Sequence, residues 1–277
     1  MNTFENIVIG RDSIPSLGIT VILMIAIPVV FSLYWCVRHK KQINIRWLIA
    51  GAAGFIISAR VLELGVHYFC IIADNPVSRF INGNTAAYVL YGASMAGVFE
   101  ECGRHIILKY FMKKNRTREN AVLYGIGHGG IEILSVLLPA MISYLVVAVL
   151  FSQGDLQNAL KTLNITEETA SAALPAVMAA ASFNYAAAAL NVAERLIAMF
   201  IHIGFSVIVY YGIENKKKRY LPLAIILHML ADTFAALYQR GVVPLPAAEV
   251  WSGIWMIVTV FIAVKLYRQM KSPSARL

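Results

Sequence analysis

Two adjacent carboxylates, Glu100 and Glu101, lie within a long, largely apolar stretch of the chain, residues 86–112. Arg104 follows Glu100 by four residues, so these two side chains share one face of a helix. The stretch is long enough to cross a membrane core of about 30 Å. An ionisable side chain at that depth costs about 2.5–3.5 kcal/mol on insertion scales. The charges therefore indicate either a functional site or an internal ion pair that joins two helices.

Three histidines occur in other apolar stretches, and two of them precede a carboxylate by one helical turn. His128 is followed by Glu132, and His228 is followed by Asp232, each four residues later. Each pair therefore lies on one face of its helix. His202 lies in a further apolar stretch. We expect all of these faces to turn inward, because a charge that faces lipid has no partner.

These residue types suit the hydrolysis of a peptide bond. Glu100 or Glu101, paired with His128, can activate water as a general base. His228 with its aspartate can then donate hydrogen bonds to the oxyanion of the attacked amide. Alternatively, a divalent metal such as zinc could bind to four of the residues, with Glu100 or Glu101 as the base. That metal set is His128, Glu132, His202 and His228.

Other hydrolase patterns are missing from the sequence. There is no H-E-x-x-H zinc motif and no G-x-S-x-G serine elbow. The three cysteines, Cys36, Cys70 and Cys102, lie in or beside apolar stretches and indicate no disulfide framework. A cysteine nucleophile is not predicted.

The composition is that of an integral membrane protein. Of the 277 residues, 59% are hydrophobic and 14% are charged, whereas soluble domains have about 45–50% apolar and about 25% charged residues. The apolar stretches have the length of helices rather than the alternating pattern of a membrane barrel. Glu5, Arg11 and Asp12 precede the first stretch, so no cleavable signal peptide is predicted.

The sequence predicts an all-α polytopic membrane protein with about seven membrane-spanning helices. They are expected at residues 17–37, 46–72, 86–112, 119–152, 192–213, 220–239 and 250–268. Pro139 should kink the fourth helix, because proline removes a backbone donor and clashes with the preceding turn. The polar residues 152–169 are predicted to form a loop. We expect residues 1–277 to form a single helical bundle domain, with its catalytic core at about residues 86–239.

The distribution of basic residues predicts the orientation of the chain. Most of the 24 Lys and Arg residues fall into four clusters, near residues 38–46, 109–118, 216–219 and 265–276. If these clusters are cytoplasmic, the N-terminus lies outside and the C-terminus inside. The alanine-rich residues 170–190 then form a non-crossing helix or an extension of the fifth span. Clusters beside spans also explain the net charge of +9 without a nucleic-acid partner.

Depth in the membrane brings the candidate residues together. At about 1.5 Å per residue, they lie between about 12 and 20 Å from the basic ends of their helices. The residues concerned are Glu100, Arg104, His128, Glu132, His202, His228 and Asp232. Several ionisable groups at one depth favour a working site over scattered packing residues. Arg60 and Glu63 lie further out, where interhelical ion pairs are expected.

Three segments of the chain together form a recognisable signature. They are Glu100-Glu101-x-x-Arg104, Tyr124-x-x-x-His128, and Leu221-Pro222-Leu223-Ala224-Ile225-Ile226-Leu227-His228-x-x-x-Asp232. This pattern resembles that of the CAAX-protease and bacteriocin-immunity intramembrane proteases. Glu132, one turn after His128, and the additional His202 make the chain more similar to the YhfC branch of that superfamily, which is related to the PrsW-type site proteases. The resemblance spans about residues 95–235.

The resemblance implies a glutamate- and histidine-dependent peptidase. Glu100 or Glu101 would activate water together with His128. His228 and Asp232 would stabilise the oxyanion. Members of the superfamily have been described both as metal-dependent and as metal-free enzymes, so zinc as a cofactor is left open.

The signature also departs from that of the CAAX-type enzymes. Arg104, which would fix the carboxylates, is separated from them by two residues where that motif has three. Tyr124 replaces a phenylalanine, and Asp232 stands where asparagine is frequent. These departures concern the mechanism more than the class of enzyme.

The preferred function is therefore an intramembrane endopeptidase. Its partners would be the lipid bilayer and a membrane-embedded or membrane-adjacent polypeptide, and it would reside in the cell membrane of a bacterium. The alternative is a proton- or metal-coupled transporter that uses the same buried groups, although no internal repeat is apparent. A third interpretation is an inert scaffold on a protease fold. Glu100 is favoured over Glu101 as the base, because Glu100 shares the helix face of Arg104.

Overall fold

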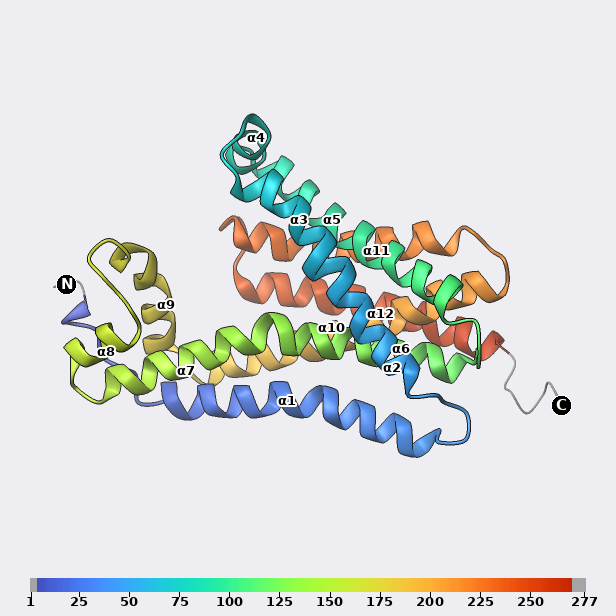
Figure 1. The fold of residues 1–277 in the computed structure, drawn as a ribbon, viewed down its shortest axis with the longest axis horizontal. Coiled ribbons are helices and arrows are strands. Elements are labelled where there is room, and N and C mark those ends of the chain that lie inside the picture. The colour runs from blue at the N-terminus through green and yellow to red at the C-terminus, as the bar shows by residue number, and fades with distance from the viewer. Residues whose placement is uncertain (1–3, 271–277) are drawn as a thin grey trace. The chain divides into compact units, whose positions relative to one another are not determined.

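The computed structural model describes residues 4–270, and these form helices and their connections without any β-strand (Figure 1). Within residues 4–270, six helical stretches are long and apolar enough to cross a membrane. They are Ser13–Arg38, Arg46–Ile72, Arg118–Ser152, Tyr185–Glu214, Tyr220–Gln239 and Leu245–Gln269. The prediction of an all-α polytopic membrane protein is therefore confirmed. The fifth stretch begins at Tyr185 rather than at residue 192, so it includes part of the alanine-rich segment.

The remaining predicted span carries the two glutamates. Helix α5 comprises Thr85–Ile106 and continues into a π-helical turn, η4, at Ile107–Phe111. It is less apolar than the six, because it contains both glutamates and Arg104. Asn84 caps its beginning by accepting a hydrogen bond from the backbone nitrogen of Ala87 at 3.0 Å.

The structure comprises two compact units. One contains the chain up to Ile27 and Ile133–Arg195, and the other contains Pro28–Glu132 and the chain from Leu196 onward. All eight predicted site residues belong to the second unit. The expected single domain over residues 1–277 stays a prediction, as does the orientation of the chain.

The first unit contains the alanine-rich segment. Helix α9, Ala170–Ser182, has 13 residues, about 20 Å, and is too short to cross a membrane by itself. Its end is tied to the start of helix α1 (Ser13–Arg38), where the hydroxyl of Ser13 donates to the carbonyl oxygen of Ala181 at 2.7 Å. The prediction of an uninterrupted loop over residues 152–169 is wrong. Helix α8, Leu156–Thr162, forms there because Asp155 accepts from the backbone nitrogen of Asn158 at 2.9 Å.

π-Helical turns interrupt two of the spans. The second span runs through α2 (Arg46–Phe55), η2 (Ile56–Glu63), α3 (Leu64–His67) and η3 (Tyr68–Ile72). The fourth runs through α6 (Arg118–Glu132), η5 (Ile133–Leu137) and α7 (Leu138–Ser152). The turn η5 ends at Leu137, two residues before Pro139. The sequence predicts a disturbance there, because the proline ring is incompatible with a regular preceding turn.

Glycines allow close contact between helices in the second unit. A β-carbon on Gly51 of α2 would lie 2.0 Å from the carbonyl oxygen of Tyr124, and one on Gly127 of α6 would lie 2.0 Å from that of Leu48. A β-carbon on Gly125 would lie 2.5 Å from the α-carbon of Ile203 in α10 (Tyr185–Glu214). Helix α6 therefore packs backbone to backbone against α2 and α10, which fixes the position of His128.

Helix α5 packs against α11, Tyr220–Gln239, which carries the third candidate histidine. A β-carbon on Gly97 would lie 2.9 Å from Met229 Cγ and 3.0 Å from the carbonyl oxygen of Ile225. Helix α12, Leu245–Gln269, packs on the same helix α11. A short helix, α4 at Pro76–Gly83, was not predicted. It begins with a capping box formed by Asn75 and Ser78.

Candidate active site

Glu100 and two histidines form a compact buried group contributed by three helices. Glu100 Oε2 lies 2.9 Å from His128 Nε2 and 3.8 Å from His202 Nδ1. The centroids of the two histidine rings are 4.9 Å apart. Each of the three side chains offers a ligand atom within 4.8 Å of the other two, and all three are buried. The group can hold a metal ion.

Arg104 forms its ion pair with Glu101, which corrects the expected pairing with Glu100. Arg104 Nε lies 3.0 Å from Glu101 Oε2, and both side chains are completely buried. The spacing of three residues also places side chains on one helix face. Arg104 further donates to the carbonyl oxygen of His202 at 3.0 Å and to Ser206 Oγ at 2.5 Å. Its guanidinium group therefore anchors α5 to α10.

Both ring nitrogens of His202 have a polar neighbour. Arg104 Nη2 lies 3.2 Å from Nδ1, and an arginine can only donate, so Nδ1 carries no proton and has the lone pair that a metal ion would take in place of the arginine. Nε2 then carries the proton and lies 2.5 Å from Glu132 Oε2. A histidine held by a carboxylate through one nitrogen is the usual arrangement of a metal-binding histidine, because the carboxylate orients the ring.

His228 connects Glu101 to Asp232. Its Nδ1 lies 2.9 Å from Glu101 Oε1, and its Nε2 lies 3.4 Å from Asp232 Oδ2. The ring stacks on Phe205, with centroids 4.8 Å apart. The side chain of Asp232 is 39% exposed, whereas that of His228 is 5% exposed. Asp232 therefore marks the accessible end of the site.

The structure brings all eight predicted residues into one connected cluster, although their roles stay predictions. The expected metal set differs from the three side chains that the structure brings to ligand distances, Glu100, His128 and His202, which form the ligand group. Glu132 contacts His202 from outside that group, and His228 is held between Glu101 and Asp232. Glu100 takes their place beside His128 and His202. The expected interhelical pairing of Glu63 also differs, because this carboxylate lies 3.4 Å from His67 of its own span.

Aromatic residues cover the histidines, and among them only Tyr124 belongs to the predicted signature. Phe55 of α2 meets the ring of His128 edge-on, with centroids 5.3 Å apart, and Phe205 covers His228. The ring centroid of Tyr124 lies 6.2 Å from that of His128. Its position one helical turn before His128 is the only feature of the sequence that indicates an aromatic ring beside a site histidine. These rings exclude water from one side of the cluster.

The ligand group fits a small divalent ion. Tetrahedral zinc with bonds of about 2.0–2.1 Å separates its ligand atoms by about 3.3 Å. The separations of Glu100 from the two histidines, 2.9 and 3.8 Å, lie on either side of that value. In addition, His128 Nδ1 is buried and has no hydrogen-bond partner among residues 4–270. Nε2 faces Glu100, so Nδ1 would carry the ring proton when Nε2 holds a metal ion.

Comparison with known proteins agrees with this geometry. The chain matches the YhfC intramembrane metalloprotease family over residues 23–251, a range that includes the whole cluster. It is 30% identical over 233 residues to the Bacillus subtilis (strain 168) protein described as "Uncharacterized membrane protein YhfC". The aligned residues cover 83% of this chain and 85% of that relative. No solved structure matches the chain. The chain therefore belongs to the YhfC family of intramembrane metalloproteases.

Proposed function

We propose that this protein is an intramembrane endopeptidase that hydrolyses peptide bonds of membrane-embedded or membrane-adjacent polypeptides, with zinc bound at Glu100, His128 and His202. The buried Glu/His/His group carries this proposal, because it joins three helices of a membrane protein at ligand distances. Membership of a metalloprotease family supports the class of reaction.

The ligand group and its neighbours would divide the work. Glu100, His128 and His202 would hold a divalent ion, which when bound would supply an activated water and polarise the scissile carbonyl. Glu132 orients the His202 ring through the contact at 2.5 Å. Arg104 holds Glu101, and Glu101 in turn holds the Nδ1 side of His228. This chain of contacts fixes the His228 ring before substrate binds.

His228 is placed to stabilise the negative charge that develops on the carbonyl oxygen. Its Nε2 lies 3.4 Å from Asp232, longer than the 2.7–3.2 Å of an ordinary N–H···O hydrogen bond. That donor can therefore turn to a substrate oxyanion. Asp232, the more exposed carboxylate, can exchange the proton that the attacking water releases and the leaving amine takes up.

A metal-free glutamate mechanism is the second candidate. The same hydrogen bond of 2.9 Å between Glu100 and His128 would position Glu100 as a general base for water. In that case the histidines would orient the carboxylate rather than bind an ion.

Metal content and cleavage test the proposal together. The full-length protein is purified in detergent, and its zinc is measured for the wild type, His128→Ala, His202→Ala and the matched control His105→Ala, which lies on α5 outside the cluster. We expect about one zinc per chain in the wild type and in the control, and little in the other two. In liposomes containing a panel of tagged single-span proteins, the wild type should release fragments, and Glu100→Gln should not.

Two outcomes would contradict the proposal. A folded wild type that binds no zinc, even after incubation with the metal, but still cleaves would favour the metal-free mechanism. A wild type that cleaves nothing yet carries protons or metal ions across the liposome membrane would favour the transporter.

A further inference from the structure

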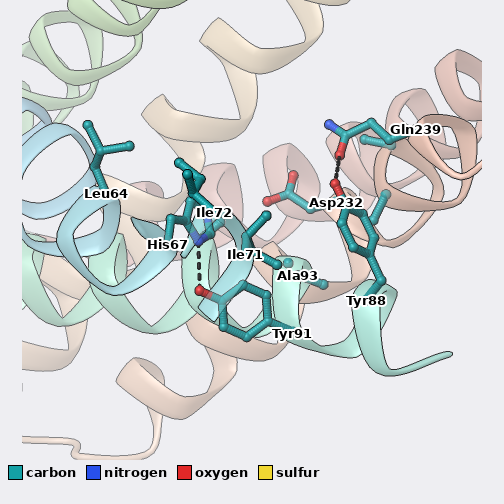
Figure 2. Close-up of a pocket in the computed structure, with 13 residues that line it drawn as sticks. Leu64, His67, Ile71, Ile72, Tyr88, Tyr91, Ala93, Asp232 and Gln239 are labelled. Carbon is teal, nitrogen blue, oxygen red and sulfur yellow. Dashed lines mark hydrogen bonds between the residues drawn. The ribbon is translucent and has the colours of Figure 1, made fainter. Parts of the chain in front are cut away.

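A cavity of about 320 Å³ lies next to Asp232 in the second unit (Figure 2). Three helical stretches line it: α3 and η3 of the second span, α5 and α11. Its walls are mostly apolar, with Leu64 and Ile71 on one side and small residues of α5 and α11 on the others. Asp232 is one of its lining residues and also contacts His228. The cavity therefore adjoins the candidate active site at Asp232.

The helical spacing of the lining residues leads into the site. On α5, Tyr88, Gly92 and Ala96 line the cavity at intervals of four residues, and the next residue in this row is Glu100. On α11, Gln239, Ala235 and Asp232 form a similar row, which continues to His228. Residues in such rows share one helix face. The two helix faces that line the cavity therefore also carry Glu100 and His228.

The chemistry of the site indicates which conformation of a substrate can be cut. Peptide hydrolysis needs an extended segment, because a helix keeps its own carbonyl groups in hydrogen bonds. The cavity of about 320 Å³ provides room for a short segment of such a chain.

Polar groups in the apolar walls suit an extended backbone. Tyr91 contacts His67 Nδ1 at 2.8 Å, and the hydroxyl of Tyr88 donates to Gln239 Oε1 at 3.0 Å, as Figure 2 shows. The side-chain nitrogen of Gln239 is a further donor. An unwound segment in a membrane exposes backbone groups that each cost several kcal/mol without a partner. These side chains can supply the partners.

We propose that this cavity is the substrate cleft and that it binds a short, unwound, apolar segment of a polypeptide beside the scissile bond. The inference rests on the proposed function, since it assigns the substrate class of the same site. Such a cleft favours substrates whose membrane spans contain residues that unwind easily, such as glycine, next to small apolar side chains.

Filling the cavity tests this assignment. A β-carbon on Gly92 would meet only the β-carbon of Ala236, at 3.9 Å, so Gly92→Leu adds its bulk inside the cavity without a backbone clash. Gly65, on α3, has no atom within 4 Å of an added β-carbon, so Gly65→Leu is the matched control. For a reporter that the wild type cleaves, Gly92→Leu should raise KM at least about tenfold and leave zinc content unchanged. Gly65→Leu should change neither. A KM for Gly92→Leu equal to that of the wild type would overturn the cleft while leaving the proposed function intact.

A binding measurement separates the cleft from catalysis. In the Glu100→Gln variant, Tyr88→p-azidophenylalanine is exposed to light in liposomes with synthetic single-span peptides. One peptide is an uninterrupted leucine span, and the other carries a central Gly-Ala-Gly. We expect cross-linking of the interrupted peptide and its loss when Gly92→Leu is added. Equal cross-linking of both peptides, or no effect of Gly92→Leu, would overturn the assignment even if no reporter is cleaved.

A second variant that fills the cavity tests the assignment if Gly92→Leu does not fold correctly. If Gly92→Leu lowers the melting temperature or the zinc content, Ala235→Leu on α11 replaces it, since Ala235 lines the same cavity from the other side. The same two results, a raised KM and lost cross-linking, are expected.

Discussion

At the scale of residues, the site depends on which side chains each of the two neighbouring glutamates contacts. Glu100 turns to His128, and Glu101 turns to Arg104 and His228. Adjacent positions on a helix differ by about 100° around its axis, so the two glutamates face different partners. Two neighbouring carboxylates can thus have separate roles, one at the ligand group and one in support of His228.

Arg104 is expected to need its planar guanidinium group. Arg104→Lys keeps the charge but cannot reach Glu101, the carbonyl oxygen of His202 and Ser206 together. We expect a loss of about 1–3 kcal/mol in the free energy of unfolding, measured as a lower melting temperature in detergent. Arg240→Lys, where Arg240 donates to the carbonyl oxygen of Asn82 on the surface, is the control. Equal melting temperatures for all three proteins would contradict this role of Arg104.

Glu132 is expected to orient His202 rather than to bind the metal. Glu132→Gln should weaken zinc binding about 10–100-fold and leave about one zinc per chain at saturation, as measured by titration with a competing chelator. The expectation follows from the position of Glu132 on Nε2 of His202, outside the compact ligand group. Complete loss of zinc at saturation would instead make Glu132 a ligand.

At the scale of elements, glycines set the distances between helices and thereby the position of His128. Gly127 is the residue before His128, and a β-carbon there would overlap the backbone of α2 at Leu48. Neither helix can relax without moving its backbone, because the overlapping atom is a carbonyl oxygen rather than a flexible side chain.

Gly127→Ala and Gly51→Ala are expected to separate α6 from α2. Each should lower the free energy of unfolding by about 1–3 kcal/mol or more and reduce zinc content, because His128 shifts away from Glu100. Gly65→Ala, for which no atom lies near the added β-carbon, should keep the wild-type melting temperature and zinc content. Wild-type values for Gly127→Ala would show that the helices can separate without harm.

At the scale of the whole molecule, the basic clusters predict one topology. The 13-residue helix α9 is too short to cross, so the connection that contains α8 and α9 should begin and end on the same side. That side should be opposite to the clusters around Lys114 and Lys217.

Accessibility of single cysteines measures this topology. In a variant without the three native cysteines, an impermeant maleimide should label Lys161→Cys in intact cells. Lys114→Cys and Lys217→Cys should react only after the membrane is opened. Labelling of Lys114→Cys in intact cells would reverse the orientation, and labelling of all three would contradict the predicted spans.

Much of the fold and of the site follows from the sequence alone. Apolar stretches of helical length predict the spans, because a membrane requires every backbone group to be paired within its helix. Spacings of four residues place His128 with Glu132 and His228 with Asp232 on common faces, and counting along each helix gives their similar depths. The short helices α4 and α8 were not predicted, although Asn75 and Asp155 are ordinary capping residues.

Only the tertiary structure decided which of the site's side chains contact one another. Helical periodicity gives the depth and face of a residue but not the rotation of its helix against the next one, which glycine contacts such as those of Gly51 and Gly127 determine. For that reason the pairing of Arg104 with Glu101, the entry of Glu100 into the ligand group, and the cavity beside Asp232 could not be derived from spacing. The sequence determined which chemical groups lie at one depth in the membrane, and helix packing determined which of them touch.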